Sequence, residues 1–326
     1  MQQNMTTSDP ATRSGGYFAP RRLGHVNLVV GDVDRSMDFY QSIVGIAPSY
    51  VQPLNRAGFL SNGNTHHDIG MVEGSGPLGR GRAPGLNHCA FELENEVDLV
   101  RGFERALAGG IEFARTQDHD IAHSVYGRDP DGNTYEVYAD VIRDWRSARS
   151  GVVTKPKPDW RPGQTPPHAE RNYDPAPRLA RVDDAVFHPR RTTHAALVVS
   201  HFERTVDYYL QVVGLEVLIG GREAPWAVLS GTCGEHSLSL FRAAPGRMNG
   251  LHHIGMELWD EEDLEHSLAR AKRNPRVSVV ADVDHAVRRA VLVEDPDGIL
   301  VQLYVDRNRS LADWAHLNPD VAVFLA

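Results

Sequence analysis

Three side chains able to bind a divalent metal stand at matching places in three predicted strands. His25 and His88 each lie in the first strand of a predicted β-α-β-β-β unit, and Glu136 lies in the last strand of the second unit. A carboxylate in mid-strand is unusual, because strands favour β-branched and aromatic residues. Two neutral imidazoles and one carboxylate form a facial set that leaves positions open on a metal ion. Such a site can bind a substrate and dioxygen side by side.

The set of residues indicates more than any one of its members. A single histidine in a strand is usually a core or surface residue, and the intervals of 63 residues (25 to 88) and 48 residues (88 to 136) prove nothing alone. Equivalent positions of paired units, however, can meet across a pseudo-twofold axis. Three further polar residues precede the carboxylate in the same predicted hairpin, whose turn is Asp-Pro-Asp-Gly: His119, His123 and Tyr126.

An internal repeat shows where these units begin. Three pairs of segments match in the same order, which indicates a duplication. They are GHVNLVVGDVDRSMDFYQSIVGI (from Gly24) with THAALVVSHFERTVDYYLQVVGL (from Thr193), GLNHCAFEL (85–93) with GLHHIGMEL (250–258), and DPDGNTYEVY (129–138) with DPDGILVQLY (295–304).

Each copy contains the pattern of one strand, one helix and three strands twice. LGHVNLVV alternates as a strand does, and VDRSMDFYQSIVG has helical spacing that Gly45 ends. We therefore predict an α+β fold of four βαβββ modules. The predicted division is a disordered arm (1–21), a catalytic metal-binding domain (22–140), a Pro-rich linker (141–189), a second domain (190–306) and a C-terminal tail (307–326). Trp160 and Tyr173 of the linker could pack on a domain and order it.

Composition excludes several classes of function. The 326 residues carry a net charge of −9 with a pI near 6.0, which argues against a nucleic-acid partner. No run of 18 apolar residues or apolar leader occurs, which predicts no membrane partner. Two cysteines are too few for a disulfide scaffold, so we expect a cytoplasmic protein.

The motifs GHVNLVV…FYQSIVG, HHDIGMVE, GLNHCAFEL and DHDIAHSVYGRDPDGNTYEVYAD resemble the vicinal oxygen chelate superfamily. They are most similar to type I extradiol ring-cleaving dioxygenases, the catechol 2,3-dioxygenase-like group. The resemblance covers roughly 22–140 and 190–306. It implies two domains with cupped mixed sheets, Fe(II) as cofactor with Mn(II) as the alternative, and a catecholic aromatic substrate and dioxygen as partners. It also implies a homo-oligomer.

The resemblance assigns roles to single residues. The family's metal ligands fall on His25, His88 and Glu136, and its acid–base histidine falls on His67 of HHDIGMV. His67 would take a proton from a catechol hydroxyl. Neighbouring strand residues face opposite sides, so we expect His66 to point away.

The hairpin before Glu136 would complete the site. By resemblance, Tyr126 would hydrogen-bond a substrate oxygen, and His119 would stabilise negative charge on bound oxygen or substrate. His123 matches the family less well, and two interpretations stay open: a substrate contact or an exposed strand residue.

The second copy departs from this pattern. It keeps the two histidines, as His194 and His253, but Gln302 stands at the carboxylate position and Leu292 at the tyrosine position; His236 and His285 match the remaining two. A neutral amide is a poorer ligand for a hard divalent ion. We therefore expect a degenerate second domain, whereas two-domain extradiol enzymes usually hold the metal in the C-terminal one.

Two other functions are compatible with the resemblance: a glyoxalase-type isomerase or epimerase, and a non-catalytic small-molecule-binding protein of the bleomycin-resistance type. His67 and Tyr126 favour the dioxygenase, since the isomerases use a carboxylate base, and binding proteins lack the full triad. The Gly-rich basic segment 72–88 is either a flexible loop or a lid whose Arg80 or Arg82 contacts an acidic substrate.

Overall fold

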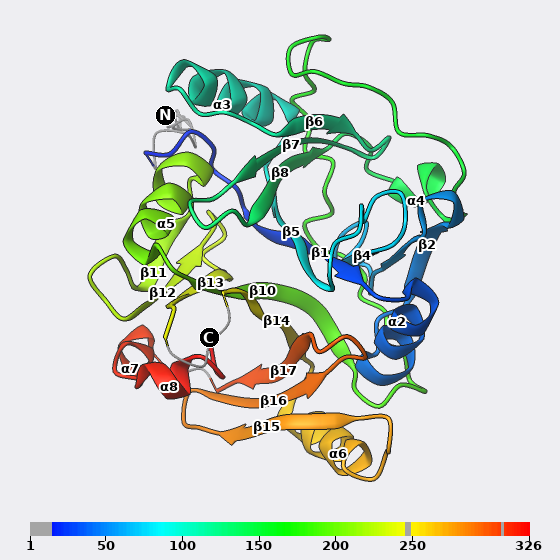
Figure 1. The fold of residues 1–326 in the computed structure, drawn as a ribbon, viewed down its shortest axis with the longest axis vertical. Coiled ribbons are helices and arrows are strands. Elements are labelled where there is room, and N and C mark those ends of the chain that lie inside the picture. Colours follow the sequence, from blue (N-terminus) through cyan, green and yellow to red (C-terminus); the bar gives the residue numbers. More distant parts are fainter. Residues whose placement is uncertain (1–14, 245–248, 308–309) are drawn as a thin grey trace, which may run out of the picture.

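The strands form two mixed sheets, one in each half of the chain (Figure 1), in a computed structural model that describes residues 15–244, 249–307 and 310–326. The first sheet has nine strands in the order β6-β7-β8-β5-β1-β4-β3-β2-β9, and the second has eight in the order β11-β12-β13-β10-β14-β17-β16-β15. The predicted α+β class with paired mixed sheets is confirmed.

The elements of the first half are β1 (Arg22–Val30), α2 (Val33–Phe39), the π-helical turn η1 (Tyr40–Val44), β2 (Pro48–Gln52), the 3₁₀ turn η2 (Pro53–Asn55), β3 (Ala57–Leu60), β4 (Ile69–Glu73), β5 (Gly85–Glu92), α3 (Glu96–Ala108), β6 (Arg115–Asp118), β7 (Ala122–Arg128) and β8 (Thr134–Asp140). The connecting segment contributes α4 (Trp145–Ala148) and β9 (Gly151–Val152). The elements of the second half are β10 (Pro189–Val199), α5 (Phe202–Tyr208), the π-helical turn η3 (Tyr209–Val213), β11 (Glu216–Gly220), β12 (Trp226–Ser230), β13 (His236–Arg242), β14 (Gly250–Leu258), α6 (Glu261–Ala271), β15 (Ser278–Asp284), β16 (Arg288–Glu294), β17 (Leu300–Asp306), α7 (Leu311–Ala315) and α8 (Pro319–Ala322).

Strand pairing confirms the four βαβββ modules. The first strand of each module runs parallel to its last: β1 with β4, β5 with β8, β10 with β13 and β14 with β17. The first strands of paired modules run antiparallel, β1 against β5 and β10 against β14. Each half is thus a pseudo-twofold pair whose centre is formed by its two first strands.

Each half sends a short arm into the other. The segment before β1 lies against η3, and the segment before β10 lies against η1. Gly45 and Gly214, which end the two π-helical turns, have φ of 91° and 82°. A Cβ on Gly45 would lie 2.1 Å from the carbonyl oxygen of Phe187, and one on Gly214 would lie 1.7 Å from that of Phe18. Only glycine permits this reciprocal contact.

The two Asp-Pro-Asp-Gly turns extend the exchange. Asp131 of the first half accepts the backbone N–H of Ser200 at 2.7 Å, and Asp297 of the second half accepts that of Gly31 at 2.9 Å. Figure 1 shows the result, with α5 beside the first sheet and α2 beside the second. One hydrophobic core includes buried residues of both halves, such as Val26 and Leu197. The repeated turn motif therefore joins the halves.

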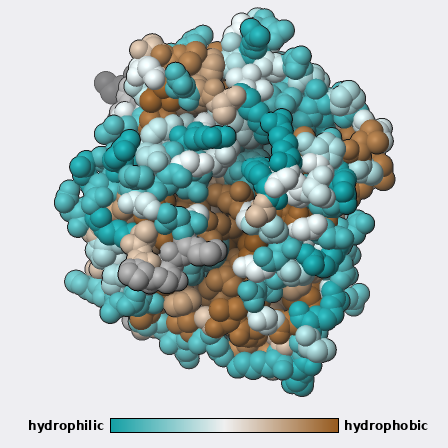
Figure 2. Space-filling model, viewed as in Figure 1, coloured by the Kyte–Doolittle hydropathy of each residue, from teal (hydrophilic) through white to brown (hydrophobic). Residues whose placement is uncertain are grey.

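The segments flanking the sheets are packed where they are described. Of the predicted arm (1–21), residues 1–14 lie outside the described residues, while Phe18 is buried. In the predicted linker, β9 pairs with β2, and Trp160 and Tyr173 are buried, as their apolar rings suggested. In the view of Figure 1 the surface is largely hydrophilic, with hydrophobic residues gathered at the centre and below it, over the second half (Figure 2). No helix of the described ranges has the length and apolarity needed to cross a membrane.

Candidate metal centre

Three neighbouring strands bring the predicted metal ligands together. In the register of β1, β5 and β8, His25 lies opposite Ala90, and Ala90 lies beside Glu136. The next residues in each strand, such as Val26, face the hydrophobic core, so alternation turns the polar set to the other face of the sheet. The candidate ligand atoms of His25, His88 and Glu136 all lie within 4.8 Å of one another, and the three side chains are buried.

The charge states of these side chains suit a cation. Glu136 Oε2 lies 2.9 Å from Nε2 of His88 and 3.4 Å from Nε2 of His25. Burial lowers the pKa of His25 to about 4 and lowers that of His88, although hydrogen bonds with Glu136 oppose both shifts. Burial alone would raise the pKa of Glu136, but hydrogen bonds from the two histidines hold it well below its usual range. Neutral imidazoles and an ionised carboxylate are the forms that bind metal.

The surroundings of the triad fit a ligand role for His88. Its Nδ1 lies 2.9 Å from Oδ1 of Asn87, a contact in which the imidazole N–H donates. This Nδ1–H tautomer is the one that would bind a cation through Nε2, in place of the tautomer whose Nε2–H donates to Glu136. The nearby His67 is buried, yet neither ring nitrogen has a hydrogen-bond partner in the described structure. Orphaned nitrogens beside a buried carboxylate indicate that further ligands belong in this site.

The prediction for His66 and His67 was wrong in its geometry. The segment HHDIGMVE begins as irregular chain, and β4 starts only at Ile69, so strand alternation does not apply to the two histidines. Both rings approach His25, with centroid separations of 5.4 Å for His66 and 4.0 Å for His67. Nδ1 of His66 also lies 3.3 Å from Oδ1 of Asp140. The histidines 25, 66 and 67 form a second group whose ligand atoms fall within 4.8 Å.

His119 and Tyr126 lie beside the carboxylate, as the hairpin suggested. Tyr126 is the direct cross-strand neighbour of Glu136 in the β7–β8 pair. Its hydroxyl lies 2.9 Å from Nε2 of His119, and that nitrogen lies 4.0 Å from Oε1 of Glu136. Burial and the nearby carboxylate raise the pKa of Tyr126 well above its ordinary value, so the phenol stays protonated and able to donate.

His123 is not brought to this cluster. It lies on the opposite face of β7, where its Nδ1 is 2.6 Å from Oε1 of Glu96 at the start of α3. Its ring stacks on Trp160 of the connecting segment, with centroids 4.3 Å apart. The alternation of β7 separates His123 from Tyr126 by three residues and so places them on opposite faces.

Two cations near the triad were missed by sequence reasoning. Arg115 of β6 lies opposite Tyr126, with its guanidinium carbon 4.0 Å from the centre of that ring. Lys157 comes from the connecting segment, and burial lowers its pKa to about 7 while the Glu136 carboxylate opposes this shift. Burial lowers the pKa of His119 well below its ordinary value, and the Lys157 charge lowers it further. No local motif marks a lysine in a Pro-rich linker as a site residue.

The equivalent place in the second half is differently filled. His194, His253 and Gln302 occupy the matching strand positions. Nη1 of Arg288 donates to Oε1 of Gln302 at 3.1 Å, and Nε2 of Gln302 donates to the carbonyl oxygen of Phe324 at 2.8 Å. Nε2 of each histidine has no hydrogen-bond partner among the described residues. The side-chain amide of Gln302, which stands in place of the carboxylate, is therefore hydrogen-bonded to a guanidinium and to the C-terminal chain.

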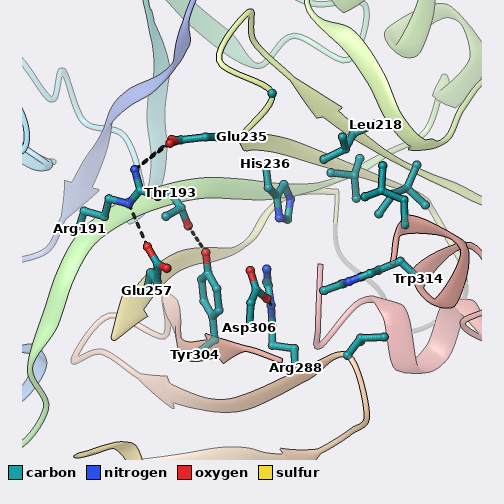
Figure 3. A pocket seen from close by; sticks show the side chains of 15 residues that line it. Arg191, Thr193, Leu218, Glu235, His236, Glu257, Arg288, Tyr304, Asp306 and Trp314 are labelled. Atoms are coloured by element: carbon teal, nitrogen blue, oxygen red, sulfur yellow. Dashed lines mark hydrogen bonds and ion pairs between the residues drawn. The ribbon is translucent and has the colours of Figure 1, made fainter. Parts of the chain in front are cut away.

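A cavity of about 290 Å³ lies next to this arrangement in the second half (Figure 3). Its charged groups largely satisfy one another. Arg191 bonds Glu257 at 2.9 Å and Glu235 at 3.0 Å, and Nε of Arg288 donates to Asp306 at 2.7 Å. The carboxylates of this cavity are therefore paired with arginine side chains. In the triad of the first half, by contrast, the carboxylate lies beside two imidazoles.

A buried group of two histidines and one carboxylate, set on paired βαβββ modules, forms a candidate metal site in an α+β fold of the vicinal oxygen chelate type. The chain belongs to the Glyoxalase/Bleomycin resistance protein/Dioxygenase superfamily, whose family model matches residues 22–137 and 191–303. The two matches cover both copies of the repeat except the last residue of each, Tyr138 and Tyr304.

Individual relatives point to the same family. The chain is 24% identical over 242 residues to the catechol-2,3-dioxygenase of Bacillus subtilis (strain 168), which covers 73% of this chain and 74% of the relative. The 2,3-dioxygenase LapB from Pseudomonas sp. KL28 has a similar fold, with a TM-score of 0.63, 15% identity, and coverage of 89% of this chain and 93% of LapB. The Mn(II)-bound glyoxalase from Novosphingobium aromaticivorans also has a TM-score of 0.63, with 14% identity and coverage of 88% and 83%.

Proposed function

We propose that this protein is an extradiol dioxygenase that opens a catechol-like ring next to its two hydroxyls, incorporating both atoms of dioxygen. The site is that of the first half, with Fe(II), or Mn(II) as the alternative, held by His25, His88 and Glu136. The observation that carries the proposal is the buried triad together with His67, His119 and Tyr126 around it. Similarity to a catechol-2,3-dioxygenase over 73% of the chain supports the reaction class.

The donor set fits the proposed ion. One carboxylate and two imidazoles match the facial triad of non-haem Fe(II) oxygenases. When bound, the ion would supply a Lewis acid that lowers the pKa of a catechol hydroxyl and would leave positions for two further ligands. Glu136 would offset one unit of its charge.

The chain's own residues would move and hold protons. His67, whose imidazole is kept neutral by burial and then by His25 and His66, would accept a proton from a catechol hydroxyl. Tyr126 would donate a hydrogen bond to a substrate oxygen, while its own oxygen would accept from Nε2–H of His119. His119 would stabilise negative charge that develops on substrate or oxygen. His66, beside Asp140, is a second candidate for the proton-accepting role.

The second half supports the proposal by contrast. Its amide and guanidinium at Gln302 and Arg288 do not supply an anionic ligand, and the C-terminal chain is bonded to both. We infer that this half is structural.

The experiment is anaerobic loading with Fe(II), followed by oxygen uptake with a panel of catechols. We expect stoichiometric oxygen consumption and a yellow ring-opened product. Isomerisation or epimerisation of a substrate without oxygen uptake would instead support a glyoxalase-type activity. Tight catechol binding without any turnover in the Fe(II)- and Mn(II)-loaded protein would support a binding protein.

A further inference from the structure

Resting on the proposed function, we propose that the substrate is a catechol that carries a carboxylate, which Arg115 and Lys157 bind at the open side of the candidate metal centre. Neither residue belongs to the βαβββ metal-ligand pattern. Their placement follows from the edge of the first sheet and from the path of the connecting segment over it.

Arg115 faces the metal centre because of its strand register. It lies in β6, the edge strand, directly opposite Tyr126 in β7. Tyr126 in turn lies directly opposite Glu136 in β8. Residues paired across antiparallel strands point to the same face. The guanidinium of Arg115 therefore lies on the face of the sheet that holds the triad, above the Tyr126 ring.

The connecting segment wraps around this edge strand and brings Lys157 to the same face. Nε2 of Gln117, which shares its face with Arg115, donates to the carbonyl oxygen of Pro158 at 2.9 Å. Oγ1 of Thr116, on the opposite face, donates to the carbonyl oxygen of Trp160 at 2.6 Å. The chain thus crosses from the metal face to the helix face between residues 158 and 160, and Lys157 precedes the crossing.

The segment before Lys157 is anchored to the loop that carries His119. Nε of Arg149 donates to the carbonyl oxygen of His119 at 2.7 Å. Asp120 accepts from Arg149 at 2.6 Å and from Lys155 at 2.5 Å. Together with the bonds from Gln117 and Thr116 to Pro158 and Trp160, they fix the segment on both sides of Lys157. Arg149 and Lys155 are thereby paired with the carboxylate of Asp120, which distinguishes them from Arg115 and Lys157.

Arg115 and Lys157 lack such compensation. Within the described ranges, neither has a carboxylate oxygen within the 4.0 Å that defines an ion pair. Positive charge accumulates around them, since burial and then the charges of Arg115, Arg80 and Arg128 lower the pKa of Arg82. Arg115 is exposed and Lys157 half-buried, and in a chain with a net charge of −9 this local excess of cations next to a substrate site would attract an anionic ligand.

Charge balance assigns that partner to the substrate. Two catechol oxygens and Glu136 would already offset the charge of a divalent ion. A neutral ring substituent would leave the half-buried Lys157 without an anionic partner and would gain nothing from the exposed Arg115. A carboxylate on the ring, or one carbon away from it, would satisfy both, and a guanidinium is well suited to bind it in a bidentate way.

The test compares anaerobic binding of 3,4-dihydroxybenzoate, 3,4-dihydroxyphenylacetate and neutral 4-methylcatechol to the metal-loaded protein by calorimetry. We expect the native protein to prefer a carboxylated catechol. Lys157→Met and Arg115→Met should each weaken that binding roughly 10–100-fold, the usual effect of losing a hydrogen bond to a charged group, and change 4-methylcatechol binding less than about threefold. Lys155→Met, whose amine is paired with Asp120, is the matched control and should keep the preference.

Several outcomes would overturn the proposal: no preference in the native protein, or equal losses for charged and neutral catechols in both variants. The second pattern would mean that the cations act on the ring oxygens or on the fold. If Lys157→Met loosens the connecting segment, two other variants test the proposal. Lys157→Arg keeps the positive charge and should keep the carboxylate preference, and Arg115→Met changes a residue of the sheet and should reduce it. Because binding is measured without oxygen, a selective loss of carboxylate affinity stands even if the protein cleaves no catechol. Cleavage of 4-methylcatechol without any carboxylate preference would refute this inference alone.

Discussion

Mild acid should destabilise the metal-free protein through its buried imidazoles. Burial lowers the pKa of His25 from 6.5 to about 4. Between these values the unfolded chain binds a proton that the folded chain does not, so the free energy of unfolding falls as the pH drops below 6.5. Six further histidines have pKa values lowered in the same direction by burial: His67, His88, His119, His194, His236 and His253.

The size of the effect follows from these shifts and from three carboxyl groups, those of Asp68, Asp129 and Asp295, whose pKa values burial raises and which therefore oppose it. When the pH falls from 7.5 to 5, His25 alone should lower the free energy of unfolding by about 2 kcal/mol. Burial raises the pKa of Asp295 to about 6, so this carboxyl group takes up a proton more readily in the folded state. Over the same pH interval it should raise the free energy of unfolding by about 1.4 kcal/mol. Each other imidazole that stays neutral at pH 5 adds a cost similar to that of His25. Since the seven imidazoles outnumber the three raised carboxyl groups, we expect a net loss on the order of a few kcal/mol.

Urea unfolding at pH 7.5 and pH 5, with a chelator to keep metal from the triad, measures this loss. His194→Asn supplies the internal check, because it removes one buried imidazole far from the candidate metal centre. Its loss of unfolding free energy between the two pH values should be smaller than that of the native protein, because burial holds the pKa of His194 well below its ordinary value. An equal or higher urea midpoint at pH 5 would refute the reasoning, since the imidazoles would then be protonated inside the fold.

Three further expectations concern the metal centre. Anaerobic reconstitution followed by elemental analysis should give one tightly bound ion per chain, and two would contradict a structural second half. Glu136→Ala should abolish metal binding, a larger loss than the roughly 10–100-fold typical of residues behind the ligands, while Gln302→Ala should leave it intact; the reverse result would move the site to the second half. His67→Phe should keep metal and catechol binding but slow turnover roughly 10²–10⁴-fold in stopped-flow measurements, whereas His168→Phe, at an exposed imidazole, should not.

The parts of the site that lie in regular strands were predictable from the sequence. His25, His88 and Glu136 sit in strands with clear alternation, and the internal repeat locates each strand within its module. Once pairing is known, the period of two places all three side chains on one face. Tyr126 and His119 followed from the same hairpin.

Where the chain leaves regular structure, sequence reasoning failed. His66 and His67 precede β4, and an irregular backbone can turn two successive rings toward one place. Lys157 reaches the centre through tertiary bonds of the connecting segment, such as that from Gln117 to Pro158, which no local pattern reports. His123 shows the opposite case, since strict alternation of β7 would have placed it away from Tyr126 had the strand limits been known.

The reciprocal arms at Gly45 and Gly214 bear on how such a chain could arise. The contacts that one half makes with the other are nearly the same in both directions, as Asp129 with Tyr209 and Asp295 with Tyr40 illustrate at 3.2 Å and 3.4 Å. Two identical half-length chains could therefore make the same contacts with each other, as an isologous dimer does.

Fusion of two such chains changes what mutation can do. In a dimer of identical chains every substitution appears in both sites at once, so a change that destroys metal binding destroys both. In the fused chain each half varies alone, while the exchanged arms and the shared core keep the two halves in contact. Gln302 and Arg288 of the second half, bonded to each other and to the C-terminal chain, are a change of the kind that such independence permits.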